Sequence, residues 1–131
     1  LGDATVCAAT LRLRREDPAT LRRRFLDIWE YKKGSQPLAD ASAGCVFRNP
    51  PGGSAGALID RAGLKARSVG GAYVSPRHAN FICAKEGATA SDVLGLIGLI
   101  RREVAARFGV ELELELEVWG RRPVRARESV A

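Results

Sequence analysis

The sequence predicts an α+β fold in which helices cover a small sheet. Apolar residues recur at helical spacing from Ser91 to Phe108, which predicts a long amphipathic helix. Two β-rich segments, 72–74 and 80–83, flank a Ser-Pro-Arg-His turn and predict a pair of strands. Residues 110–118 alternate strictly between aliphatic side chains and glutamates, as in a strand with one buried face. Strands and helices in this order are typical of an α+β layer.

The first 35 residues predict one strand and one helix. Thr5–Leu13 is β-rich and then alternates, so we expect a strand there. Asp17 can cap a helix and Pro18 tolerates its first position. Glycine can adopt the left-handed conformation, so the helix should end near Gly34. The apolar residues of this helix follow at helical spacing, opposite a face of arginines: Leu21, Phe25, Ile28 and Trp29.

Residues 35–53 predict a loop, because prolines and glycines recur throughout the segment. Val46-Phe47 is the one place where we expect a short strand. The centre of this loop is too apolar for a disordered linker. Loops held by a scaffold often carry binding or catalytic residues.

Helix caps place the remaining elements. Ser54 can cap a short helix that runs to Ala62 and ends at Gly63. Thr89 or Ser91 caps the longest helix, and Gly109 ends it. Gly70-Gly71 is followed by no phosphate-loop pattern, so these glycines predict a tight turn and a close backbone approach. The buried residues expected in the two helices are Leu58 and Ile59, then Val93, Leu96, Ile97, Ile100, Val104 and Phe108.

Composition limits the classes of protein. No apolar run approaches the roughly 20 residues that cross a bilayer, and no signal peptide is evident at the start. The three cysteines are widely spaced, which predicts reduced thiols in the cytoplasm rather than a disulfide framework or a zinc site. With one histidine, a histidine-rich metal site is excluded. The chain contains no methionine, so we expect that an N-terminal portion precedes Leu1.

The net charge of +6 raises the alternative of nucleic-acid binding. Aromatic residues make up 6% of the chain and do not alternate with basic ones, as they would in a stacking platform. A solvated helix face and a basic tail over 121–131 account for most of the excess charge. An anionic ligand such as a pyrophosphate would use one or two of these cations. We therefore expect no nucleic-acid partner and no membrane partner.

Cys45 is the most informative single residue. An isolated cysteine is often an inert small hydrophobic residue, but this one follows Gly44 in a loop rather than in a periodic core segment. A thiol with a reference pKa of about 8.5 stays mostly protonated at neutral pH yet donates a proton far more readily than a serine hydroxyl. Cys45 is thus a candidate functional residue.

Three blocks together resemble one enzyme family. They are Ser42-Ala43-Gly44-Cys45-Val46-Phe47-Arg48-Asn49-Pro50, Gly70-Gly71-Ala72-Tyr73-Val74-Ser75-Pro76-Arg77-His78-Ala79-Asn80-Phe81 and Leu114-Glu115-Leu116-Glu117-Val118-Trp119-Gly120. In this order they are similar to the C-terminal part of the UDP-N-acetylenolpyruvoylglucosamine reductases, also called UDP-N-acetylmuramate dehydrogenases. No long insertion separates the second block from residues 54–64, as in the shorter of the two family types.

The resemblance implies a flavoenzyme of peptidoglycan synthesis, needed for cell wall, cell shape and cell division. NADPH would reduce bound FAD, which would then reduce the enolpyruvyl UDP-sugar. Residues 1–35 would be the C-terminal end of the FAD-binding domain and 36–120 the substrate-binding domain, followed by the basic tail. Most FAD contacts would belong to segments outside this chain, so we expect the fragment alone to be inactive. No obligatory protein partner is expected.

The resemblance also implies roles for individual residues. Cys45 would protonate the substrate carbon beside the carboxylate, and relatives often have serine there. Glu117 matches the family's active-site glutamate, with one residue fewer before the glycine, and Glu115 is the alternative. Gly44 would contact the cofactor.

Four further residues would bind the substrate in this comparison: Lys33, Asn49, Arg77 and His78. Other interpretations remain open for three of them. Lys33 could be a charged helix end favoured by the dipole, Asn49 an Asn-Pro turn, and His78 a turn-stabilising residue. For the whole chain, a non-catalytic ligand-binding or interaction module remains the alternative to an enzyme.

Overall fold

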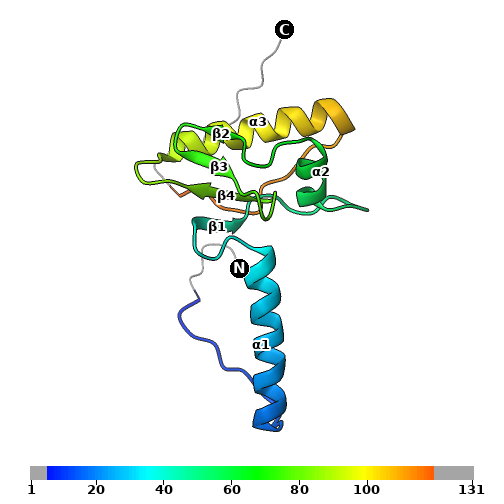
Figure 1. Ribbon diagram of the computed structural model, residues 1–131, viewed down its shortest axis with the longest axis vertical. Helices are drawn as coiled ribbons and strands as arrows, with labels where there is room; N and C mark the ends of the chain where they lie inside the picture. Colours follow the sequence, from blue (N-terminus) through cyan, green and yellow to red (C-terminus); the bar gives the residue numbers. More distant parts are fainter. Residues whose placement is uncertain (1–5, 120–131) are drawn as a thin grey trace. The chain divides into compact units, whose positions relative to one another are not determined.

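The computed structural model describes residues 6–119 (Figure 1). Its elements, in chain order, are α1 (Pro18–Ser35), β1 (Ala41–Cys45), α2 (Ala55–Arg61), β2 (Ser68–Val69), β3 (Ala72–Val74), β4 (Phe81–Ala84) and α3 (Ala90–Phe108). They form two compact units, 1–31 and 32–131, and the division falls within α1. The α+β prediction is confirmed. No helix in the described range is long and apolar enough to cross a membrane.

Helix α1 begins where the sequence predicted. The backbone N–H and hydroxyl of Thr20 donate to Asp17 Oδ2 at 2.9 and 3.0 Å, so Asp17 caps the helix and Pro18 follows it. The prediction that Gly34 ends the helix in a left-handed conformation is wrong, because α1 continues through Gly34 to Ser35. The chain bends only at Gln36 and turns after Pro37.

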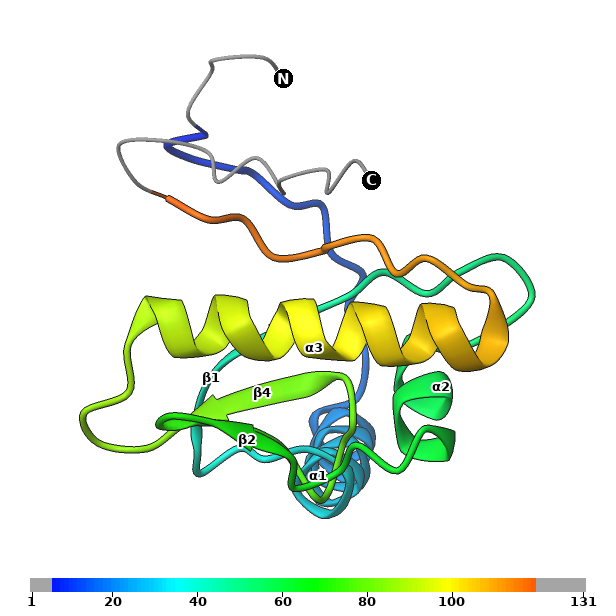
Figure 2. The ribbon, with the colours of Figure 1, turned by 90° about the horizontal axis from the view of Figure 1, so that it is seen from above.

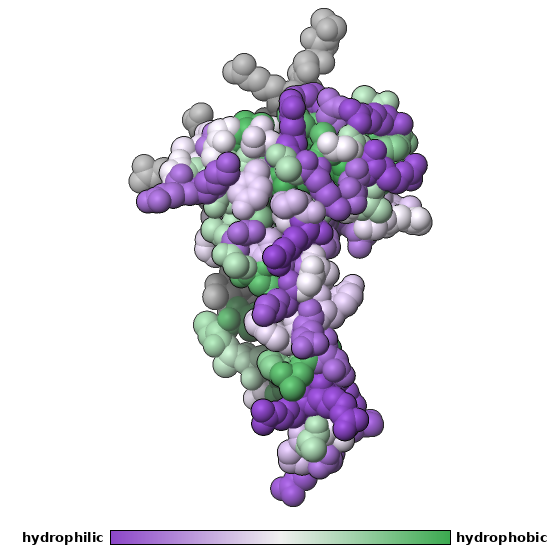
Figure 3. Space-filling view, viewed as in Figure 1, coloured by the Kyte–Doolittle hydropathy of each residue, from purple (hydrophilic) through white to green (hydrophobic). Residues whose placement is uncertain are grey.

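The predicted strand at 5–13 is wrong over its described part. Residues 6–17 form neither strand nor helix, and Thr5 lies outside the described residues. A strand requires a hydrogen-bonded neighbour, and among the described residues these have none in a sheet. Residues 6–31 are all exposed, including the large apolar side chain of Phe25. Figure 3 shows hydrophobic surface along α1.

The second unit is built on a four-stranded antiparallel sheet of order β1-β4-β3-β2. The predicted strands at 72–74 and 80–83 are confirmed as β3 and β4. Strand β1 lies in the predicted loop, and the short strand expected at Val46-Phe47 is instead one bridge between Phe47 and Leu114. Strand β2 was not predicted, since two residues carry no periodicity.

The segment 110–118 is not the regular strand that its alternation predicted. It pairs with residues 46–48 through the bridge and two backbone hydrogen bonds, from Arg48 N–H to Glu113 O and from Glu115 N–H to Val46 O, both 2.9 Å. The partner segment soon reaches Pro50, which has no N–H to donate. The predicted facing holds over 110–116, where Leu112 is buried and Leu114 and Leu116 are partly buried, and all four glutamates are exposed. It is wrong at Val118, which was expected on the buried face and is 48% exposed.

Helix α3 covers one face of the sheet (Figures 1 and 2). Thr89 caps it in a reciprocal arrangement with Asp92, and Gly109 ends it with a φ of +66°. The predicted stripe is confirmed, since Leu96, Ile100 and Val104 are fully buried. Ile97 is buried too, and Val93 and Phe108 are partly buried. Helix α2 is capped by Ser54 and buries Ile59, with Leu58 half-buried, as predicted.

The pair Gly70-Gly71 allows the close approach that the sequence predicted. Gly70 has a φ of +52°, and a Cβ there would lie 2.2 Å from Asp92 Oδ1. A Cβ on Gly71 would lie 2.7 Å from Ala88 Cα. Side chains at either position would push the β2–β3 turn away from the start of α3.

Candidate active site

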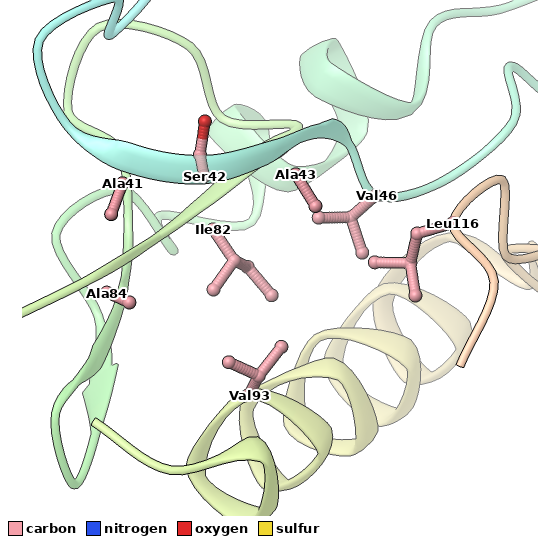
Figure 4. Close-up of a pocket in the computed structure, with 8 residues that line it drawn as sticks. All are labelled: Ala41, Ser42, Ala43, Val46, Ile82, Ala84, Val93 and Leu116. Atoms are coloured by element: carbon pink, nitrogen blue, oxygen red, sulfur yellow. The ribbon is translucent and has the colours of Figure 1, made fainter. Parts of the chain in front are cut away.

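The two faces of the sheet have different chemistry. On the α3 side, a pocket of about 220 Å³ is lined mainly by aliphatic side chains (Figure 4). Ala41, Ile82 and Val93 point into it, whereas Ser42 points away. Because side chains alternate along a strand, the neighbours of Ile82 in β4 lie on the opposite face. That face carries the sequence-predicted thiol.

Cys45 lies at the end of β1, directly opposite Phe81 of β4. Its neighbour Val46 lines the aliphatic pocket, so the thiol is on the other face together with the Phe81 ring. The imidazole of His78 packs against that ring edge-on, with centroids 4.7 Å apart. The thiol therefore sits in a half-buried, partly aromatic setting.

The surroundings of Cys45 keep its thiol protonated. Burial raises the pKa of Cys45, and the carboxylate of Glu115 raises it further. A hydrogen bond with the Asn80 side chain acts in the opposite direction and is the smallest of the three effects. A thiol with a raised pKa is a proton reservoir at neutral pH rather than a nucleophilic thiolate.

Glu115, the alternative in the sequence analysis, is the glutamate that lies near the thiol. Its N–H bonds to Val46 O, which fixes it beside Cys45. Leu114 and Leu116 pack against the core, so the intervening side chain points outward. Glu117 instead accepts a hydrogen bond from Trp119 Nε1 at 3.4 Å. Gly120, the last residue of that predicted block, lies outside the described residues.

Asn80 is a site residue that the sequence analysis did not identify. It is buried, and its amide holds the backbone of Phe47 from both sides: Phe47 N–H donates to Oδ1 at 3.0 Å, and Nδ2 donates to Phe47 O at 2.8 Å. The same side chain interacts with the Cys45 thiol. The available signal was a polar residue directly before an apolar strand.

Asn49 and Arg77 both have structural partners. Asn49 Oδ1 accepts from Ala55 N–H at 3.0 Å, so it holds the first turn of α2, close to the turn role left open for it. Arg77 Nη1 donates to the backbone O of Lys33 at 3.1 Å. This bond brings two of the predicted substrate-binding residues together near the end of α1.

His78 stabilises the turn before β4. Its Nδ1 accepts from Asn80 N–H at 3.3 Å, and its own N–H donates to Ser75 Oγ at 3.3 Å. Burial lowers the pKa of His78, and the charge of Lys65 lowers it further, so the imidazole is neutral at pH 7. Its other ring nitrogen, Nε2, then carries the proton and can donate to a ligand.

Gly44, the predicted cofactor contact, has a φ of +86°. A Cβ at this position would meet no atom of the described chain within 4 Å. The backbone beside the thiol is thus uncovered by the described chain, and the cofactor contact expected at Gly44 stays a prediction. The φ value itself disfavours any residue with a side chain.

The fold and this site define a class: an α+β domain that holds a half-buried, protonated thiol, Cys45, near a carboxylate on the face of its sheet away from α3. The sequence model described as UDP-N-acetylenolpyruvoylglucosamine reductase, C-terminal domain, matches residues 36–119. The chain belongs to this family.

Comparison with individual relatives supports the same family membership. The chain is 46% identical over 120 residues to UDP-N-acetylenolpyruvoylglucosamine reductase 2 of Symbiobacterium thermophilum, covering 92% of this chain and 39% of that protein. It is 50% identical over 111 residues to the reductase of Protochlamydia amoebophila, covering 85% and 36%. The crystal structure of the Thermus caldophilus reductase matches with a TM-score of 0.69 and 42% identity, covering 83% and 38%. The chain thus spans less than two-fifths of these relatives' length.

Proposed function

We propose that this chain is the substrate-binding C-terminal portion of a reductase that converts UDP-N-acetylenolpyruvoylglucosamine to UDP-N-acetylmuramate in peptidoglycan synthesis. The observation that carries the proposal is the Cys45 thiol, held protonated beside Glu115 in a domain of this family. An enolpyruvyl group becomes a lactyl group by gaining a hydride at one carbon and a proton at the next. A positioned thiol can supply that proton.

FAD, reduced by NADPH, would supply the hydride when bound, mainly through segments beyond this chain. Cys45 would hold its proton until negative charge develops on the carbon beside the substrate carboxylate. The raised pKa keeps the thiol loaded, because both burial and Glu115 disfavour the thiolate. The Asn80 amide offsets part of this cost, since its hydrogen bond favours the thiolate that remains after transfer.

Glu115 is our choice for the active-site glutamate, in place of Glu117. Two observations support this choice: the Glu115 carboxylate raises the pKa of Cys45, and the Glu115 backbone N–H donates a hydrogen bond to Val46 O. Lys33, Arg77 and His78 would bind the UDP-sugar at the neighbouring turn, with Asn49 holding the loop that connects Cys45 to α2. These roles, and the cytoplasmic location that the substrate implies, belong to the proposal.

The test compares Cys45→Ala with Cys45→Ser in the full-length protein that contains this chain. Flavin reduction by NADPH and its reoxidation by the enolpyruvyl substrate are followed separately by absorbance. We expect Cys45→Ala to slow reoxidation by about 10²–10⁴-fold, the usual range for a general acid, with flavin reduction unchanged. Cys45→Ser should retain part of the rate.

A matched pair then decides between the glutamates. Glu115→Gln should slow reoxidation, whereas Glu117→Gln should leave it close to the unchanged protein. The reverse result would return the role to Glu117. If the unchanged protein binds no flavin and shows no substrate-dependent turnover, the reductase proposal fails. The alternative, a non-catalytic ligand-binding module, then stands.

A further inference from the structure

The aliphatic pocket on the α3 side of the sheet has room for one more side chain. Its volume is about 220 Å³, and three of the residues that line it, Ala41, Ala43 and Ala84, are alanines. An apolar cavity of about 150 Å³ is large enough for a benzene molecule. Removing apolar surface from water is favourable, so an aliphatic side chain that entered this pocket would be stabilised there.

Val118 is an aliphatic residue that lies close to the pocket in the chain but does not line it. Leu116 points into the pocket beside Val46 (Figure 4). Val118 follows two residues later, so the two Cα atoms, of Leu116 and Val118, lie within about 7 Å of each other. In the alternating segment 110–118 it is the next residue after Leu116 on the aliphatic side, yet it is 48% exposed. The chain bends at Leu116, where the alternation of burial ends.

The backbone of β1 offers a place for the residues beyond this bend. The pairing between 46–48 and 113–115 ends at the hydrogen bond from Glu115 N–H to Val46 O. Strand β1 directly precedes Val46, and among the described strands it pairs with β4 alone. Its other edge therefore carries backbone groups that can pair with a further strand. If residues 116–118 straightened along that edge, alternation would place Val118 on the same side as Leu116, over the pocket.

We propose that Val118 is a positioning residue: it enters the aliphatic pocket when residues 116–118 straighten along β1, and it thereby holds Glu115 beside Cys45. The benefit of holding Glu115 rests on the proposed function. Before the bend, the backbone of residues 113 and 115 is bonded to 46–48. After it, the described hydrogen bond of the segment is at the surface, from Trp119 Nε1 to Glu117. Val118 in the pocket would fix the chain on the far side of the bend as well.

NMR on the 131-residue chain observes this arrangement directly. We expect nuclear Overhauser contacts between the methyl groups of Val118 and those of Ile82 and Val93, which line the pocket. Ala84→Leu puts a larger side chain into the pocket from β4, so it should remove these contacts while Val118 itself is intact. Absence of contacts from Val118 in the unchanged chain would overturn the proposal. Contacts from the Trp119 indole in their place would also overturn it, because the pocket would then have a different occupant.

Two conservative substitutions separate a role in the pocket from a role at the surface. Val118→Thr keeps the shape of the side chain but adds a hydroxyl, and Val118→Ile keeps it aliphatic. At a half-exposed surface position both should be nearly neutral. In the pocket the hydroxyl would have no hydrogen-bond partner, because Ser42, the polar residue of the lining, points away. Val118→Thr should therefore lower the population of the inserted form roughly tenfold, measured from the methyl shifts of Ile82 and Val93, while Val118→Ile retains it.

The same two variants test the link to Glu115 in the full-length protein that contains this chain. Reoxidation of the reduced flavin by the enolpyruvyl substrate should slow in Val118→Thr and stay unchanged in Val118→Ile. KM should not change in either variant, because no substrate contact is removed. In a Glu115→Gln background, Val118→Thr should cause no further loss, since it acts through that carboxylate.

Equal rates in Val118→Thr and Val118→Ile would overturn the positioning role, and so would an additive loss in the double variant with Glu115→Gln. The NMR contacts do not depend on flavin chemistry. Contacts from Val118 in a protein without reductase turnover would remove the reductase proposal and leave the pocket assignment standing. Turnover that requires Cys45, in a protein whose Val118 makes no contact in the pocket, would do the reverse.

Discussion

Helices α1 and α3 have nearly the same length, 18 and 19 residues, and both carry apolar residues at helical spacing. In α3 that stripe is buried against the sheet, with Leu96, Ile100 and Val104 at 0% exposure. In α1 no residue is buried, and Phe25 is 64% exposed. The comparison shows that a helical pattern predicts which face is apolar, whereas burial depends on a covering surface that the pattern does not specify.

Replacing a matched isoleucine in each helix should give the largest difference. Ile100→Ala deletes a fully buried side chain and leaves a cavity, so it should lower the free energy of unfolding by about 2–5 kcal/mol. Ile28 is 50% exposed, and Ile28→Ala should change stability by roughly 0.5 kcal/mol or less. Urea unfolding of the 131-residue chain measures both. Equal losses would mean that α1 buries its stripe in solution.

The same glycine substitution should have opposite effects at the two helix ends. Gly109 adopts a φ of +66°, so Gly109→Ala should destabilise the second unit by about 1–2 kcal/mol. Gly34 is helical and has no atom within 4 Å of a built Cβ. Gly34→Ala should favour the helix by about 0.5–1 kcal/mol, seen as increased helical circular dichroism. A destabilising Gly34→Ala would show that the last turn of α1 needs glycine.

Acid should destabilise the N-terminal caps of α1 and α3, because each cap depends on a different carboxylate. The N–H groups of Thr89 and Gly71 lower the pKa of Asp92 below 3.8, and Thr20 does the same for Asp17. A carboxylate with a lowered folded-state pKa contributes stability above its unfolded pKa and loses it as pH falls through the folded one. The midpoint temperature of thermal unfolding of the second unit should therefore decrease when the pH is lowered below about 3.8.

Asn substitutions assign this acid effect to each helix. Asp92→Asn should flatten the acid dependence of the thermal midpoint, while Asp17→Asn should flatten only the acid loss of helical signal from α1. An unchanged acid dependence in Asp92→Asn would place the titrating group elsewhere. Because both carboxylates are at the surface, added salt should reduce each effect.

The sequence predicted local features well where one residue or one short pattern decides them. Asp17, Ser54 and Thr89 begin their helices as caps, and Gly109 ends α3. The sequence-based prediction failed for segments that become strands only when another strand pairs with them. Residues 6–13 have strand character without a neighbouring strand, and 110–118 faces as predicted up to Leu116 but pairs only briefly with 46–48.

The candidate site shows the same division. The sequence and its resemblance selected Cys45, His78 and Arg77, whose roles stay predictions. Between Glu115 and Glu117 the alternation gave no choice, because both lie on the same exposed side of the segment. The hydrogen bond from Glu115 N–H to Val46 O joins residues about half the chain apart, and the Glu115 carboxylate raises the pKa of Cys45. Asn80 was overlooked because its importance comes from Phe47, 33 residues away.

By itself, the sequence determined the helix caps, the buried stripe of α3, the turn at Gly70-Gly71 and the family. These depend on backbone sterics, on periodicity and on short motifs, all of which act within a few residues. Only the tertiary structure decided the order of the strands, the separation of an aliphatic face from a thiol-bearing face, and the environment that raises the pKa of Cys45. Each of these requires residues distant in the chain to meet, and the free energy of such contacts depends on which surfaces are brought together.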